Sequence, residues 1–129
     1  MIYLDSSAVV KLARQESETD ALRAWLAAHP QPLVASALAR TEATRAIRRN
    51  EPAAVTVLRA VLTLLHQKPI TDAVLDAAAD LPGPTLRSLD AIHLANAEEF
   101  RPVLAWFVVY DKRLAEAARA RGLPVVSPS

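Results

Sequence analysis

The stretch IYLDSS at residues 2–7 decides the fold of this chain. Ile2–Leu4 is short, apolar and rich in residues that favour β-structure, so it predicts a buried strand. Asp5 ends that strand, and its side chain and those of the two serines that follow can cap a helix, predicted over residues 8–14. The stretch therefore predicts a strand that leads directly into a helix, with an acid at the junction.

Strands and helices continue to alternate along the chain. Short apolar runs predict further strands at residues 33–35, 105–110 and 125–126, and a strand of one or two residues at 69–70. Helical patterns predict helices at residues 17–28, 36–49, 53–66, 72–79, 89–100 and 112–121, the last of which Gly122 can end. Because the strands are apolar throughout, both faces of the sheet are expected to be covered. The pattern predicts an α/β fold with three layers, α/β/α, around a central, mainly parallel sheet.

The composition narrows the possible functions. A chain of 129 residues predicts a single domain over residues 1–129. The absence of cysteine excludes a disulfide scaffold, a zinc finger and a thiol nucleophile. A formal net charge of +1 argues against a strongly basic nucleic-acid binder, and 52% hydrophobic residues argue against disorder. No stretch resembles a signal peptide or has the roughly 18 apolar residues of a membrane span, so a cytoplasmic location is expected.

Two acids follow predicted strands, and two others lie on predicted helices. Asp5 and Asp111 come directly after apolar runs. The carboxyl ends of parallel strands share one edge of a sheet, which is where ligands of such sheets bind. Glu42 lies beside inner-face residues of the third predicted helix, and Asp90 lies in the first turn of the sixth. We expect these four carboxylates to meet at that edge.

A cluster of four carboxylates needs a cation. At a separation of about 4 Å and an effective dielectric constant near 20, each like-charged pair costs about 4 kcal/mol. An all-oxygen set of ligands selects a hard ion, Mg²⁺ or Mn²⁺, which favours phosphodiester or phosphoryl chemistry. Taken singly, Asp5 and Asp90 could be helix caps, and Glu42 could pair with Arg45 or Arg49. The joint placement of all four acids favours a site.

Neither serine nor histidine chemistry is expected at this edge. Ser6 and Ser7 have no base beside them in the sequence, so a serine nucleophile is not predicted. His93 lies one turn after Asp90. We expect it to be a hydrogen-bonded residue that packs the helix, with a role as a metal ligand as the alternative.

Four motifs resemble those of a known family. Asp5, Ser6 and Ser7 after the first strand, Glu42 in the third helix, SLDAIHLA at residues 88–95 and YDKRL at residues 110–114 follow one another as in PIN domains. The pattern is most similar to the VapC-type toxins of bacterial and archaeal toxin–antitoxin pairs, and the resemblance covers nearly the whole chain.

The resemblance implies an Mg²⁺- or Mn²⁺-dependent endoribonuclease. Its acids would be Asp5, Glu42, Asp90 and Asp111, with Ser7 assisting near the metal. An RNA substrate, a cognate antitoxin protein and a homodimer are implied as partners. The chain departs from the family pattern at Val109, where the family often has threonine. That change removes a hydroxyl that could hold a carboxylate or a water molecule.

These residues lead to a mechanistic hypothesis. Asp5, Glu42 and Asp90 bind one ion, while Asp111 completes the cluster or recruits a second ion. The ion lowers the pKa of a bound water, and the resulting hydroxide attacks the phosphorus. Hydrolysis of this kind leaves a 5′-phosphate and does not use the RNA 2′-hydroxyl, so 2′,3′-cyclic phosphate ends would exclude it.

Basic residues near the acids are expected to guide the RNA, and their contribution would weaken with salt. The candidates adjoin the acids in the sequence or lie on neighbouring helix faces: Arg87, Lys112, Arg45, Arg49 and Lys11. The alternative function is a non-catalytic PIN-like module that binds RNA or protein. A phosphotransfer enzyme fits less well, because Ser7 stands where a haloacid-dehalogenase-type phosphatase has its second aspartate.

Overall fold

The computed structural model describes residues 1–129 and has a central sheet of five strands, every neighbouring pair of which is parallel. The strand order is β3-β2-β1-β4-β5. The strands are β1 (Ile2–Leu4), β2 (Leu33–Ser36), β3 (His66–Lys68), β4 (Trp106–Val108) and β5 (Val125–Val126). The predicted α/β fold with a parallel sheet is confirmed.

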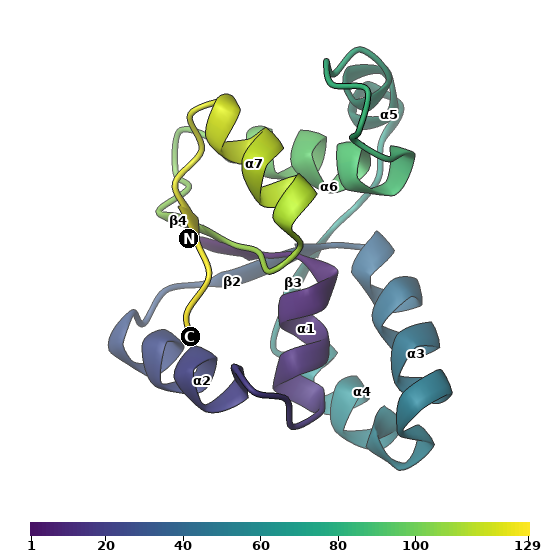
Figure 1. Cartoon of the computed structure of the whole chain (residues 1–129), viewed down its shortest axis with the longest axis vertical. Coiled ribbons are helices and arrows are strands. Elements are labelled where there is room, and N and C mark those ends of the chain that lie inside the picture. The colour runs from purple at the N-terminus through teal and green to yellow at the C-terminus, as the bar shows by residue number, and fades with distance from the viewer.

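Helices cover both faces of the sheet (Figure 1). They are α1 (Ser6–Ala13), α2 (Thr19–Ala28), α3 (Leu38–Asn50), α4 (Val55–Thr63), α5 (Asp72–Ala79), α6 (Ser88–Glu98) and α7 (Lys112–Ala120), with a short 3₁₀ turn, η1 (Pro52–Ala54). Helices α1 to α4 form one layer, and α5 to α7 form the other (Figure 1). No helix has the length and apolar character needed to cross a bilayer.

The central strand β1 explains why the strands are apolar throughout. Ile2 and Leu4 pack into the core on the side of α1 to α4, whereas Tyr3 packs into the core beneath α6 and α7. Successive side chains of a strand point to opposite faces, so a sheet covered on both sides buries every position. All three residues of β1 are fully buried. In this register Leu4 lies beside Ala35 of β2 and Val108 of β4, which aligns the ends of the three strands.

Some predicted boundaries are wrong. The helix expected over residues 53–66 ends at Thr63, and the third strand is His66–Lys68 rather than residues 69–70. The strand β3 lies at an edge of the sheet and is partly exposed, so it tolerates polar residues that no apolar pattern could reveal. Ser88, expected to cap α6, is instead the first residue of that helix. Gly122 does follow α7 with a φ of +78°, a conformation that glycine adopts without strain.

Candidate active site

Asp5 lies at the carboxyl end of β1 and caps α1. Its carboxylate accepts hydrogen bonds from the backbone N–H of Ala8 at 2.9 Å and from the hydroxyl of Ser7 at 2.7 and 2.8 Å. Only 3% of the residue is exposed. Burial raises the pKa of Asp5 to about 6, although the hydrogen bonds from Ser7 and Ala8 act in the opposite direction. Ser7 therefore fixes the orientation of Asp5.

Asp111 follows β4 and caps α7 in the same way. Its Oδ1 accepts a hydrogen bond of 2.9 Å from the backbone N–H of Leu114. The end of β4 is tied to α1, because the backbone N–H of Tyr110 donates to Ser7 Oγ at 3.3 Å. Asp111 is close enough to Asp5 to add to the increase in pKa that burial causes there. The two strand ends thus bring both acids to one edge of the sheet.

Glu42 of α3 and Asp90 of α6 reach this edge from the two opposite helical layers. Burial raises the pKa of Glu42, but hydrogen bonds with His93 and Ser6 outweigh that effect and leave the pKa below its usual value. Burial raises the pKa of Asp90, and the charges of Asp111 and Glu42 add to the increase. The charge of Asp111 therefore acts on both Asp5 and Asp90, and the charge of Glu42 acts on Asp90.

The carboxylates do not form a ready-made coordination shell. No group of three or more histidine and acidic side chains has the geometry to hold an ion. Asp5, Glu42 and Asp111 each face hydrogen-bond donors of the protein. The side chains nevertheless fit a hard divalent cation, because their ligand atoms are carboxylate oxygens. In addition, the buried Asp5 and the half-buried Asp90 lie near like charges that a cation would offset.

Val109 is a core residue. It is fully buried in the core beneath α6 and α7, together with Phe107, Leu94 and Leu114. Its neighbours Val108 and Tyr110 pack on the opposite side of the sheet. A hydroxyl at position 109 would therefore lie among apolar side chains.

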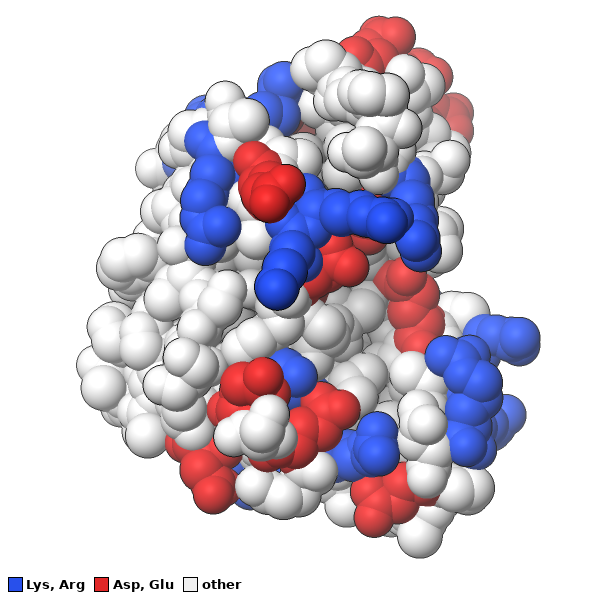
Figure 2. All heavy atoms as spheres, in the orientation of Figure 1, with Lys and Arg blue, Asp and Glu red and all other residues white.

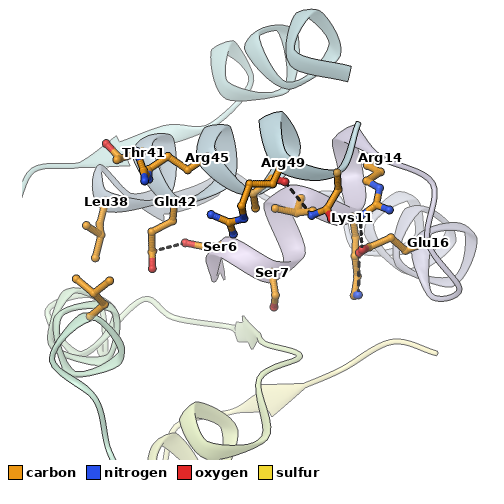
Figure 3. Close-up of a pocket in the computed structure, with 14 residues that line it drawn as sticks. Ser6, Ser7, Lys11, Arg14, Glu16, Leu38, Thr41, Glu42, Arg45 and Arg49 are labelled. Carbon is orange, nitrogen blue, oxygen red and sulfur yellow. Dashed lines mark hydrogen bonds and ion pairs between the residues drawn. The ribbon is translucent and has the colours of Figure 1, made fainter. Parts of the chain in front are cut away.

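A cavity of about 710 Å³ opens beside Ser6 and Glu42, between α1 and α3 (Figure 3). Arg45 and Arg49 of α3 line it, are exposed and form no ion pair within 4.0 Å. Lys11 also lines the cavity, but its ammonium group is bound by Glu16 at 3.1 Å and Glu18 at 3.2 Å. Among the predicted basic residues on this side, the two arginines are thus the ones with free cationic groups.

A second group of basic residues lies on the other side of the acids. Arg87 immediately precedes α6, and Lys112 is the first residue of α7, so both adjoin the helix starts that carry Asp90 and Asp111. Both side chains are exposed. Figure 2 shows basic side chains on either side of an acidic patch near the middle of this face.

Ser6 and His93 form a contact that the sequence reasoning missed. His93 Nε2 lies 2.5 Å from Glu42 Oε1 and 3.1 Å from Ser6 Oγ, so a histidine does lie beside Ser6 in space. The arrangement differs from a nucleophilic triad, in which the two ring nitrogens of the histidine face the serine and the acid separately. Here one nitrogen faces both. His93 is 2% exposed and hydrogen-bonded, which confirms the expected packing role.

Comparison with known proteins agrees with this geometry. A family model described as "PIN domain" matches residues 2–120. Ribonuclease VapC35 of Mycobacterium tuberculosis (strain ATCC 25618 / H37Rv) is 46% identical over 131 residues, which cover 99% of this chain and 97% of that protein. Ribonuclease VapC46 of the same strain is 44% identical over 128 residues, which cover 99% of this chain and 98% of that protein.

Solved structures share the fold. The crystal structure of Mycobacterium tuberculosis VapC20, described as a sarcin–ricin loop cleaving toxin, superposes with a TM-score of 0.79 at 16% identity and covers 99% of this chain and 100% of that one. A toxin–antitoxin complex from Klebsiella pneumoniae superposes with a TM-score of 0.74 at 21% identity and covers 100% of this chain and 98% of that one.

A parallel sheet whose carboxyl edge gathers acids from four elements, together with the match over residues 2–120, defines a PIN domain. Identity of 44–46% to two relatives over nearly their full length gives a closer assignment. The chain belongs to the VapC-type toxins of the PIN-domain family.

Proposed function

We propose that this VapC-type toxin is a metal-dependent endoribonuclease that uses Asp5, Glu42, Asp90 and Asp111. The observation that carries the proposal is the environment of the buried Asp5. Burial raises the pKa of Asp5 to about 6, and Asp111, at the end of the neighbouring strand, adds to the increase. Such an arrangement lowers the stability of the folded protein, because a buried carboxylate without a neutralising partner costs free energy. It is typical of functional sites. A divalent cation held at this edge would offset that cost.

Asp5, Glu42 and Asp90 are the residues that would hold the ion, with Asp111 beside them. Bound Mg²⁺ or Mn²⁺ lowers the pKa of a water molecule and offsets the negative charge that develops on the phosphate. The chain itself orients the acids: the Ser7 hydroxyl fixes Asp5 by sharing its single hydrogen between the two carboxylate oxygens, and the start of α7 fixes Asp111. No side chain of this set has to act as a covalent nucleophile.

The basic residues support an RNA substrate that crosses the acidic patch. Arg45 and Arg49 would bind phosphates on the side of α3, and Arg87 and Lys112 would bind phosphates on the side of α6 and α7. Lys11 would contribute mainly by holding the loop after α1, because Glu16 and Glu18 bind its ammonium group. Binding through phosphates predicts an affinity that falls steeply with salt.

The same proposal includes a cognate antitoxin and a homodimer. Solved structures with this fold include FitAB bound to a DNA fragment and VapBC2 of Rickettsia felis bound to a promoter fragment, with TM-scores of 0.74. An antitoxin partner for this chain would block the acidic edge. A cytoplasmic location, where RNA and antitoxin are both available, belongs to this proposal.

Cleavage of RNA by the purified chain tests the proposal. We expect cleavage with Mg²⁺ or Mn²⁺, loss of cleavage with EDTA or in Asp5→Ala, and products with 5′-phosphate ends. Products with 2′,3′-cyclic phosphates would refute the mechanism. RNA binding without cleavage would instead support the alternative function, a non-catalytic binding module.

A further inference from the structure

His93 joins three elements that are distant in the sequence. It lies on α6, is almost fully buried, and contacts Glu42 of α3 and Ser6 of α1 through the same nitrogen, Nε2. Ser6 Oγ also donates to Glu42 Oε1 at 2.6 Å, and Figure 3 shows these two side chains facing one another. One carboxylate oxygen is therefore held from two directions.

The hydrogen positions in this group follow from counting donors. A serine hydroxyl has a single hydrogen, and that of Ser6 is directed to Glu42. Ser6 Oγ can then only accept from His93, so Nε2 must carry a hydrogen that points toward both oxygens. The other ring nitrogen, Nδ1, is buried without a hydrogen-bond partner. That atom is then an unprotonated acceptor, which leaves no buried N–H unpaired.

We infer that His93 and Ser6 are positioning residues that tie down Glu42 Oε1 and leave Oε2 directed to the acidic edge. Every hydrogen bond of the Glu42 carboxylate is made by Oε1, and Oε2 has no protein partner. The part of the inference in which Oε2 binds a divalent ion rests on the proposed function. The part that assigns the hydrogens and the fixed orientation stands on the contacts alone.

Glu42 has an alternative partner that shows why it needs to be held. Arg45 lies three residues further along α3 and Arg49 seven, so an acid at position 42 could pair with Arg45 on the helix surface. In the structure Glu42 forms no ion pair with either arginine and contacts His93 and Ser6 instead. Without His93 and Ser6, the flexible glutamate would turn toward the arginines of the cavity, and would thereby weaken both the acidic edge and the phosphate contacts.

A pair of substitutions separates positioning from packing. His93→Gln keeps an N–H donor near the place of Nε2, whereas His93→Leu removes it. Asn96→Leu is the matched control, because Asn96 is fully buried one turn later on α6 and donates only to the backbone of Pro69. Calorimetric titration with Mn²⁺ alone, kcat and KM for RNA cleavage, and Tm are measured for all variants.

We expect His93→Leu to weaken Mn²⁺ binding and to lower kcat by about 10- to 100-fold, the usual effect of losing a residue that orients a ligand. His93→Gln should recover most of both values. Asn96→Leu should change Tm without changing the affinity for Mn²⁺. An unchanged affinity and kcat in His93→Leu would overturn the inference, and so would an Asn96→Leu variant that loses Mn²⁺ binding equally.

Nitrogen NMR of the histidine rings tests the hydrogen pattern without metal or RNA. We expect His93 to carry its hydrogen on Nε2, in slow exchange with water, and we expect rapid exchange in Glu42→Ala. A hydrogen on Nδ1 would overturn the inference. If the wild-type chain neither binds Mn²⁺ nor cleaves RNA, the proposed function fails, whereas the NMR result still decides whether His93 holds Glu42.

Discussion

Asp5→Asn should destroy activity and stabilise the metal-free protein. The unfolded chain ionises Asp5 near pH 3.8, whereas burial raises its pKa in the folded protein to about 6. Between these values the native state holds a proton that the unfolded state has lost, so the free energy of unfolding falls as the pH rises through this window. Because the two pKa values differ by about two, the ionised Asp5 lowers the free energy of unfolding by about 3 kcal/mol above pH 6.

Asparagine removes that cost and keeps an oxygen that can accept from the N–H of Ala8. The Ser7 hydroxyl, whose single hydrogen is shared between both carboxylate oxygens, keeps only one of these acceptors, so we expect a net gain of about 1–3 kcal/mol. Urea unfolding in the presence of EDTA, at pH 7.5 and at pH 5, measures the free energy of unfolding of both proteins. The wild-type chain should be more stable at pH 5 than at pH 7.5, and the variant should show a smaller difference.

Two controls complete this experiment. Asp76→Asn changes an exposed acid on α5 that is not one of the four site acids, and should leave stability within about 0.5 kcal/mol of the wild type. Added Mn²⁺ at 100 times its Kd should stabilise the wild-type chain by about 2.7 kcal/mol and should leave Asp5→Asn nearly unchanged. An Asp5→Asn variant that is less stable than the wild type at pH 7.5 in EDTA would refute the reasoning.

Three further changes give distinct results. Replacing both Arg45 and Arg49 by alanine should raise KM for RNA and reduce the salt dependence of binding by about two counterions, as measured by titration at several salt concentrations. Ser7→Ala should lower the free energy of unfolding by about 1–2 kcal/mol and reduce cleavage, because Asp5 loses its hydroxyl donor. Val109→Thr should cost about 1–3 kcal/mol in urea unfolding without increasing activity, because the new hydroxyl is buried among apolar side chains; a more active Val109→Thr variant would contradict the placement of this residue.

The sequence predicts the edge acids well because the signals for them are local. An apolar run followed by a capping acid marks both the junction of β1 with α1 and the junction of β4 with α7. The rule that parallel strands share their carboxyl edge then brings Asp5 and Asp111 together. Asp90 and Glu42 are predicted from their places beside apolar helix residues, although their helices lie in different layers.

The contacts of His93 could not be predicted because they depend on packing between elements. Its two partners are 51 and 87 residues away, and no periodicity encodes such a meeting. The spacing of Asp90 and His93, three residues apart on one helix, was the only local signal. Lys11 shows the same limit, since its pairing with Glu16 and Glu18 depends on how the loop after α1 folds back.

The separate origins of the four acids have a consequence for synthesis of the toxin. Asp5 and Glu42 lie in the first half of the chain, Asp90 in the second, and Asp111 at the start of the last helix. A nascent polypeptide lacks the β4 strand, which pairs directly with β1, until residues 106–108 have been translated. The ribosome that makes this chain is therefore not exposed to a complete acidic edge until the last of the four acids, Asp111, has been translated.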